Sequence, residues 1–254
     1  MLEQINAHPR DSQIIFYEEG HKYVYLPNNT KFISVTTIIH EYFPKFDADK
    51  IIANMMGSSK WTDSKYYGMT PEQIKKVWDQ NRDEAANSGT KMHKRIENFY
   101  NQVPEDAPMT TEYSYFLQFW KEFQHVNPDF FPYRSEWIVY DEGKNLAGSI
   151  DFILSNKEGE LVILDWKRSK SINTSNRWQK GFGPFEGLDD CNYMHYTIQL
   201  NCYRHILETK YNKTILGMYL VILHPNQICA EIIPVEKKVD IISALWERLP
   251  LNKH

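Results

Sequence analysis

A strand that ends in two charged residues constrains this chain most. Residues 161–167 read Leu-Val-Ile-Leu-Asp-Trp-Lys, so an apolar run leads into an acid and a lysine two positions apart. Four consecutive apolar residues indicate a strand covered on both faces, as in the centre of an α/β sheet. Side chains alternate along a strand, so Asp165 and Lys167 share one face and Trp166 takes the other. Two charges at such a position are costly unless they are paired or bound to a ligand.

A second acidic strand precedes this one. Asp-x-Lys tripeptides are common at solvated strand ends, so this one alone is weak evidence for a catalytic site. The neighbouring segment 146–154, which is apolar and carries Asp151, strengthens that interpretation. The connection Asn-Lys-Glu-Gly-Glu, with Gly159 suited to a positive φ, indicates a hairpin that sets Asp151 beside Asp165. Gly148 would permit a close approach of backbone or ligand. Two such carboxylates suit a hard cation such as Mg²⁺, and two unrelated strand acids are the alternative.

Two predicted helices add polar side chains at helical spacing. His93 and Glu97 are four positions apart and share a face beside an apolar stripe, although such a histidine is more often a core residue than a ligand. Gln199 and Tyr203 have the same spacing, which also occurs on ordinary amphipathic helices. Each of these motifs is weak when it is taken alone.

The ordered set of motifs resembles the PD-(D/E)xK nuclease superfamily, and within it the RecB-type exonuclease branch, which includes mitochondrial and viral single-strand exonucleases. The resemblance covers residues 89–203 and consists of Gly89-x-x-x-His93, Glu136, Gly148-Ser-Ile-Asp151, Asp165-Trp-Lys167 and Gln199-x-x-x-Tyr203. It implies an α/β fold with a restriction-endonuclease-like core, a central mixed β-sheet flanked by helices, with an N-terminal hairpin and helical additions. Residues 1–254 would form one nuclease domain, with 1–84 as its N-terminal hairpin and helical region and 85–254 as its core.

The resemblance also implies a role for each matching residue. The metal ligands would be His93, Asp151, Asp165 and the carbonyl group of Trp166. The catalytic group would be Lys167, Glu136, Gln199 and Tyr203. Glu136 would either bind a second metal through a water molecule or act as a base that does not contact the metal. Glu97 would fix the tautomer of His93. The proline of the superfamily name is absent, because Ser149-Ile150 precede Asp151.

The implied activity is metal-dependent hydrolysis of DNA phosphodiester bonds by an exonuclease that favours single strands or free ends. Mg²⁺ or Mn²⁺ would be the cofactor, and three cysteines are too few for a four-cysteine iron–sulfur cluster. Replication, repair or recombination proteins would be the partners. An RNA endonuclease of the same fold and a non-catalytic nucleic-acid-binding module are the alternatives.

The long connection over residues 168–194 mixes aromatic, basic and glycine residues. Bases stack on aromatic rings while cations follow phosphates, so this composition is typical of a single-strand channel, with a self-packed surface loop as the alternative. The residues that we expect to contact nucleic acid are Lys94, Arg168, Arg177, Trp178, Lys180 and Phe182.

Composition sets the remaining bounds. A formal net charge of −4 gives no independent sign of a nucleic-acid binder, although phosphate contacts are local. Three cysteines in no pairing pattern indicate a reducing, intracellular compartment, the cytoplasm or nucleoid. The resemblance also allows a viral or phage source. The N-terminal residues show no signal sequence, and no apolar run is long enough to cross a bilayer.

Periodicity and turn residues predict the other elements. A hairpin is expected over 13–33, and a capping box at Thr70 begins a helix that ends near residue 81. Further helices are expected at 35–43, 47–57, 87–100, 111–125, 196–207 and 238–248, and further strands at 133–140, 214–223 and 228–234.

Overall fold

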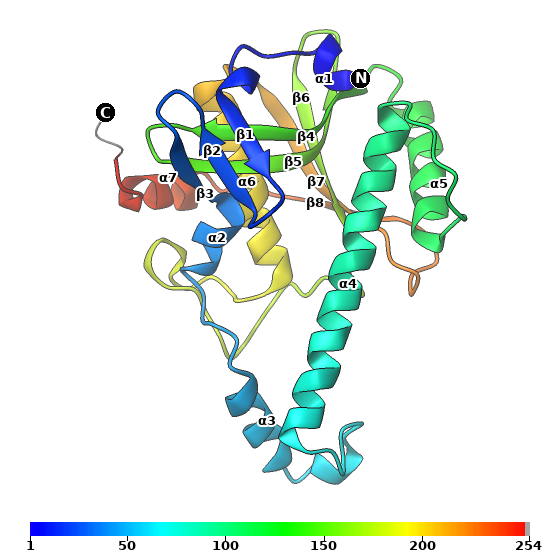
Figure 1. Cartoon of the computed structure of the whole chain (residues 1–254), viewed down its shortest axis with the longest axis vertical. Coiled ribbons are helices and arrows are strands. Elements are labelled where there is room, and N and C mark those ends of the chain that lie inside the picture. Colours follow the sequence, from blue (N-terminus) through cyan, green and yellow to red (C-terminus); the bar gives the residue numbers. More distant parts are fainter. Residues whose placement is uncertain (252–254) are drawn as a thin grey trace. The chain divides into compact units, whose positions relative to one another are not determined.

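The sheet consists of an N-terminal part and a core part. The computed structural model describes residues 1–251, in which eight strands form one mixed sheet (Figure 1). The N-terminal part is an antiparallel meander of β1 (Ile14–Tyr17), β2 (Lys22–Tyr25) and β3 (Thr30–Ser34). The core part contains β4 (Phe131–Asp141), β5 (Leu146–Ser155), β6 (Leu161–Lys167), β7 (Ile215–Ile222) and β8 (Glu231–Pro234). The predicted mixed α/β sheet is confirmed.

Strand β5 is the branch point between the two parts. One of its edges pairs antiparallel with β4 along the whole strand. Its other edge is shared, because the parallel pairing with β3 ends at Ala147 and the antiparallel pairing with β6 begins at Phe152. Residues 148–151 therefore lie in a fork, where β3 and β6 diverge from a common neighbour.

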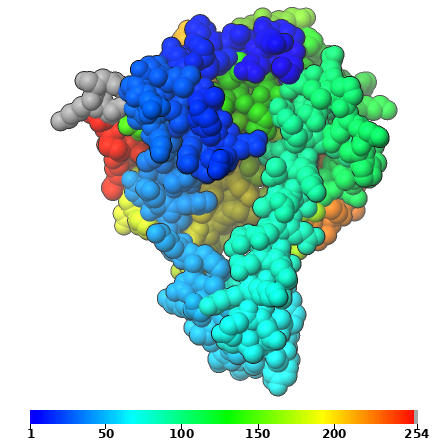
Figure 2. Space-filling view, in the orientation of Figure 1, coloured from blue at the N-terminus to red at the C-terminus, as the bar shows by residue number. Residues whose placement is uncertain are grey.

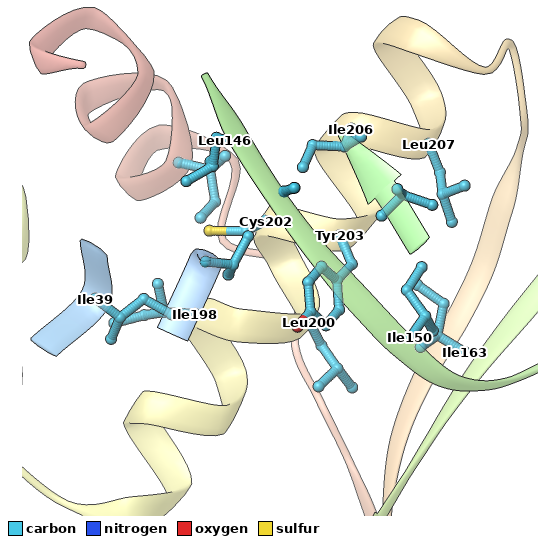
Figure 3. Packing of buried hydrophobic residues seen from close by; sticks show 14 of the residues in the cluster. Ile39, Leu146, Ile150, Ile163, Ile198, Leu200, Cys202, Tyr203, Ile206 and Leu207 are labelled. Carbon is cyan, nitrogen blue, oxygen red and sulfur yellow. The ribbon is translucent and has the colours of Figure 1, made fainter. Parts of the chain in front are cut away.

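Helices cover both faces of the core strands. One face packs against α2 (Val35–His40), α6 (Asn192–Lys210) and α7 (Val239–Arg248), and Figure 3 shows the apolar side chains of α6 against the strands. The other face packs against α5 (Thr111–Val126) and the last turns of α4 (Pro71–Tyr100). Ile153 joins the first cluster while Phe152 and Leu154 join the second. This alternation explains why continuous apolar runs form central strands here.

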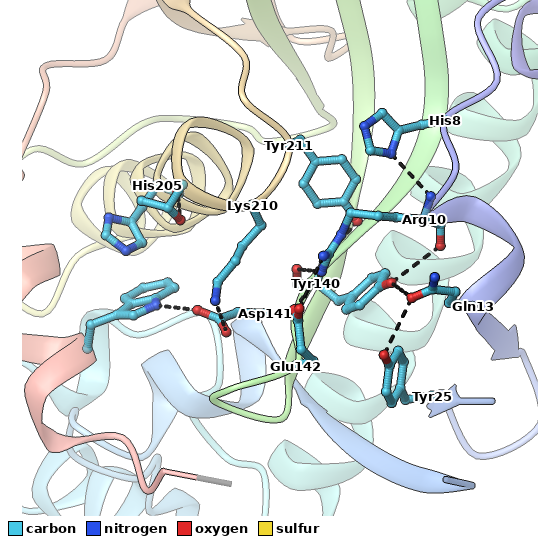
Figure 4. Close-up of polar contacts among 12 residues, drawn as sticks. His8, Arg10, Gln13, Tyr25, Tyr140, Asp141, Glu142, His205, Lys210 and Tyr211 are labelled. Atoms are coloured by element: carbon cyan, nitrogen blue, oxygen red, sulfur yellow. Dashed lines mark hydrogen bonds and ion pairs between the residues drawn. The ribbon is translucent and has the colours of Figure 1, made fainter. Parts of the chain in front are cut away.

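The N-terminal segment, which contains α1 (Leu2–Ile5) and η1 (Asp11–Gln13), is fastened to β4 by Arg10. The Arg10 guanidinium donates to both carboxylate oxygens of Glu142 at 3.2 and 2.6 Å and stacks 4.1 Å from the centre of the Tyr140 ring (Figure 4). Figure 2 shows this segment in blue against the green of the core strands. A forked, stacked arginine holds one geometry better than a lysine could, so this contact fixes the segment on the sheet.

Residues 45–91 form a compact unit of their own, apart from the unit made by residues 1–44 and those from 92 onward. It contains α3 (Ala48–Met56), η2 (Trp61–Asp63) and the first turns of α4, with Ile52 and Ile74 as its buried residues. The predicted capping box is present, because Thr70 and Gln73 exchange hydrogen bonds of 2.8 and 3.3 Å. The expected single nuclease domain, with its N-terminal region ending at residue 84, stays a prediction.

Several element boundaries differ from the prediction. Residues 71–100 form one helix of 30 residues instead of two, because no proline interrupts them and one glycine lowers helix stability by only about 1 kcal/mol. The N-terminal hairpin is a three-stranded meander, since a turn with Gly20 at φ 77° precedes the turn near Asn29. Helix α6 is longer than predicted and β8 shorter, while η3 (Gly183–Phe185) lies in the long connection.

Candidate metal centre

Three side chains from three different elements converge at the fork of β5. The Nδ1 atom of His93 lies 3.6 Å from Asp151 Oδ2 and 3.9 Å from Glu136 Oε1, and one ligand atom from each residue lies within 4.8 Å of the others. These distances are too long for hydrogen bonds. They match the roughly 3–4 Å between ligands that each lie about 2.1 Å from an octahedral cation. Two carboxylates and one imidazole fit Mg²⁺ or Mn²⁺.

His93 reaches the site from the last turns of α4. Met92 and Ile96 on the same helix are buried in the cluster on that face of the sheet, which fixes the position of the helix. Burial alone would lower the pKa of His93, but the carboxylates of Asp151 and Glu136 outweigh it and raise this pKa to about 9. The imidazole therefore carries a proton at neutral pH when no metal is bound.

Glu136 has a backbone conformation that is rare within a strand. Its φ is 47°, although Ser135 and Trp137 on either side pair regularly with β5. A left-handed conformation costs a residue with a side chain about 1–2 kcal/mol, and such strain clusters at functional sites. The hydroxyl of Ser149 donates to Glu136 Oε2 at 3.1 Å, so the carboxylate is held from β5.

Asp151 is oriented by the neighbouring strand. The backbone N–H of Trp166 donates to Asp151 Oδ2 at 2.9 Å, as an antiparallel hairpin with Gly159 at φ 80° allows. Burial raises the pKa of Asp151, although His93 and Lys167 lower it. The Trp166 side chain is buried on the opposite face among aromatic residues, as alternation predicted.

Asp165 and Lys167 form a pair beside the three convergent residues. Lys167 Nζ lies 2.6 Å from Asp165 Oδ2 and 4.7 Å from the centre of the Tyr196 ring. Burial raises the pKa of Asp165 to about 6. Burial alone would lower the pKa of Lys167, but the carboxylates of Asp165 and Asp151 outweigh this effect and raise it. Asp165 is thus neutralised by its own strand neighbour and lies outside the group of three, so its metal role and that of the Trp166 carbonyl stay predictions.

Tyr203 is a buried residue of the core. It is 3 % exposed and lies among the apolar side chains of the first cluster (Figure 3). Gln199 Nε2 donates to its hydroxyl at 3.2 Å. A Cβ atom at position 148 would lie 2.5 Å from Tyr203 Cε1, so Gly148 makes room for this ring. Glycine is thus required by a tyrosine of the protein itself, where the sequence predicted a close approach of backbone or ligand. Burial raises the pKa of the Tyr203 phenol, and the charges of Asp165 and Asp151 raise it further, so the ring lies near these acids. The catalytic role of Gln199 and Tyr203 stays a prediction.

The residues expected to contact nucleic acid are dispersed. Trp178 is 92 % exposed and Phe182 is 49 % exposed, and Phe182 packs edge-on against Tyr42. Arg177 and Trp178 help to line a cavity of about 460 Å³ near the start of α6. Exposed aromatic rings in this connection are available for stacking, as a single-strand channel requires.

The other expected contacts are already engaged in ion pairs. Lys180 is paired with Asp189, and Arg168 Nε donates to Glu112 at 2.7 Å. Lys94 Nζ lies 2.8 Å from the carboxylate of Glu97. Within residues 1–251, no hydrogen bond joins Glu97 to His93. The expectation that Glu97 fixes the His93 tautomer stays a prediction, and the contact seen for Glu97 is its ion pair with Lys94. The sequence also missed Ser149 and Tyr23, whose proximity to Glu136 arises only from strand pairing.

Comparison with known proteins identifies a family and solved structures that are similar to this chain. A family model described as the PD-(D/E)XK nuclease superfamily matches residues 108–240, which include Glu136, Asp151, Asp165 and Lys167. The crystal structure of SSO0001 is similar at 14 % identity and a TM-score of 0.34, over 84 % of this chain and 71 % of that chain. A search of curated proteins finds no match. Among the described residues, no helix has both the length and the apolarity that a membrane span needs.

Proposed function

The chain belongs to the PD-(D/E)XK nuclease superfamily, and from that premise we propose that it is a deoxyribonuclease using Mg²⁺ or Mn²⁺, an exonuclease that favours single strands or free ends. Membership itself indicates a metal-dependent nuclease that acts on nucleic acid. The observation that carries the proposal is the convergence of His93, Glu136 and Asp151 beside the Asp165–Lys167 pair.

The side chains divide the chemistry between them. His93, Glu136 and Asp151 would hold a divalent cation, which when bound activates a water molecule and withdraws charge from a phosphate. The carboxylates of Asp165 and Asp151 raise the pKa of Lys167 against the effect of burial, so its ammonium group stays protonated. A protonated lysine stabilises negative charge on the scissile phosphate and cannot take a proton from water. We therefore assign Lys167 an electrostatic role.

The preference for single strands rests on the long connection that follows β6. Trp178 is 92 % exposed, so its indole ring faces solvent, where a base could stack on it. Its backbone N–H donates to the Asn176 side chain at 3.0 Å, so the exposed ring stands on a braced turn. The faces of the bases are accessible in a single strand and covered by neighbouring bases in a duplex, so an exposed aromatic ring favours single-stranded substrates.

The test compares four labelled substrates: linear single-stranded DNA, circular single-stranded DNA, blunt duplex and RNA. We expect Mn²⁺- or Mg²⁺-dependent loss of the linear single strand, an intact circle and little cleavage of RNA. Cleavage that persists in excess chelator would refute the metal-dependent mechanism. Degradation of the circle would show endonuclease action, and faster cleavage of RNA would show a ribonuclease.

Substitution of the lysine separates chemistry from binding. Lys167→Ala removes one charge that stabilises the transition state, so cleavage should fall by about 10²–10³-fold while Mn²⁺ binding is retained. The control is Lys157→Ala in the β5–β6 turn, whose side chain is 71 % exposed and which should cleave normally. Wild-type cleavage by Lys167→Ala would show that β6 does not carry the catalytic lysine.

A further inference from the structure

We propose that Ser149 is a positioning residue that holds the Glu136 carboxylate in the metal centre, and that the Tyr23 hydroxyl of the N-terminal meander supports the same group of acids. The inference rests on the proposed function for its chemistry, because it concerns how a proposed ligand is kept in place. It adds two residues whose sequence context indicates no role.

The two oxygens of Glu136 have separate neighbours. Oε1 lies 3.9 Å from His93 Nδ1 and belongs to the convergent group, while Oε2 accepts a hydrogen bond of 3.1 Å from the Ser149 hydroxyl. A carboxylate with one oxygen bonded to a neutral donor keeps its second oxygen free for a cation. Ser149 is therefore placed to set the orientation of the ligand without competing for the metal.

The fork in the sheet explains why Ser149 is available. β3 stops pairing with β5 at Ala147 and β6 starts at Phe152, so Ser149 lies where that edge of β5 has no neighbouring strand. Glu136 meets it from the opposite edge, with a φ of 47° between two regular pairs. A strained backbone conformation persists only where its surroundings enforce it, and the hydrogen bond from Ser149 to the Glu136 side chain is one such contact.

Tyr23 approaches the same carboxylate from the meander. It is 3 % exposed and pairs with Phe32 of β3, the strand that adjoins the start of β5, so the charges of Glu136 and Asp151 act on its phenol. Burial together with those carboxylates raises the pKa of Tyr23 to about 12. The phenol thus stays neutral and adds a polar group to the acids without adding a negative charge.

A purely structural role for Tyr23 makes a different prediction. Its ring lies 4.8 Å from the centre of the Phe16 ring, so it also packs in the meander. Tyr23→Phe keeps that ring and removes only the hydroxyl. If the ring alone mattered, this variant would be silent, whereas a positioning hydroxyl predicts a change in metal affinity.

The experiment measures Mn²⁺ affinity of the full chain by titration calorimetry, with no nucleic acid present. Ser149→Ala and Tyr23→Phe should each weaken Mn²⁺ binding by about 10-fold, as is typical when a partner of a metal ligand is lost. The matched controls are Ser155→Ala, on the same strand, and Tyr25→Phe, on the same strand of the meander. Both remove a hydroxyl that bonds elsewhere and should bind as wild type does.

A double-mutant cycle tests whether Ser149 acts through Glu136. In a Glu136→Ala background, Ser149→Ala should have no further effect on Mn²⁺ affinity. Wild-type affinity in both Ser149→Ala and Tyr23→Phe, equal losses in the controls, additive effects in the cycle or a wild-type protein that binds no Mn²⁺ would each overturn the inference. A protein that shows the expected affinities but cleaves no nucleic acid would refute the proposed function alone.

Discussion

Gly148→Ala should destabilise the protein through a single clash. The added Cβ would lie 2.5 Å from Tyr203 Cε1 and 2.9 Å from its hydroxyl, and Tyr203 is 3 % exposed in a packed core. Overpacking of this kind costs about 1–3 kcal/mol. For a chain of this size, each kcal/mol lowers the unfolding midpoint by about 2–4 °C. Because Asp151 lies three residues along the same strand, cleavage should fall as well.

Tyr203→Leu provides the second arm of a cycle. It removes the ring atoms that the new Cβ would meet, so Gly148→Ala should be nearly neutral in this background. The coupling free energy between the two sites should then be about 1–3 kcal/mol, measured by urea unfolding followed by circular dichroism.

The matched control is the same substitution in α4. A Cβ at Gly89 meets no atom within 4 Å, so Gly89→Ala should stabilise the helix by about 0.5–1 kcal/mol. Additive effects of Gly148→Ala and Tyr203→Leu would refute the claim that this glycine makes room for the tyrosine ring.

Three further predictions concern pH, stability and substrate. The pKa of His93 is raised to about 9, so Mn²⁺ must displace a proton from His93 at pH 7. The apparent affinity for Mn²⁺ should therefore rise with pH up to about 9, and calorimetric heats that depend on the buffer should report the released proton. Without metal, the stability that protonated His93 contributes is fully present below about pH 6.5 and is lost through pH 9; a flat unfolding profile there would contradict this. Arg10→Ala removes two charged hydrogen bonds to Glu142 and should lower the free energy of unfolding by about 2–3 kcal/mol. The control is Arg82→Ala, which should change it by less than about 0.5 kcal/mol because the Arg82 side chain is 68 % exposed. Trp178→Ala should weaken single-strand binding by about 1–3 kcal/mol in a fluorescence anisotropy titration and leave thermal unfolding unchanged, because its ring is 92 % exposed; equal binding would exclude stacking.

Local patterns in the sequence were sufficient for the central strands. The alternation that places Asp165 and Lys167 on one face and Trp166 on the other follows from strand geometry alone, and the structure has it. The hairpin before them was predictable because Gly159 supplies the positive φ that its turn requires. The capping box at Thr70 depends on residues three positions apart, so it too could be read directly.

Long-range pairing was beyond such patterns. Tyr23 is more than a hundred positions from Glu136 in the sequence, and it approaches Glu136 only because β3 pairs with the start of β5. Nothing around Glu136 signals a φ of 47°, since neither glycine nor asparagine stands there. The sequence left two outcomes open for Asp165 and Lys167, an ion pair or a bound ligand; the resemblance favoured the metal for this acid, and the structure has the ion pair.

The backbone at Glu136 sets activity against stability. A φ of 47° is strained for glutamate but is tolerated by glycine and asparagine, and the negative charge of Glu136 also raises the pKa of nearby Asp151. Above about pH 9, where His93 is neutral and no longer gains from the Glu136 charge, Glu136→Asn should relieve backbone strain and charge crowding together. The metal-free variant should then unfold at a higher temperature, and it should bind Mn²⁺ more weakly. Selection for thermal stability alone would drive this position away from glutamate, so the residue marks a place where function opposes the most stable chain.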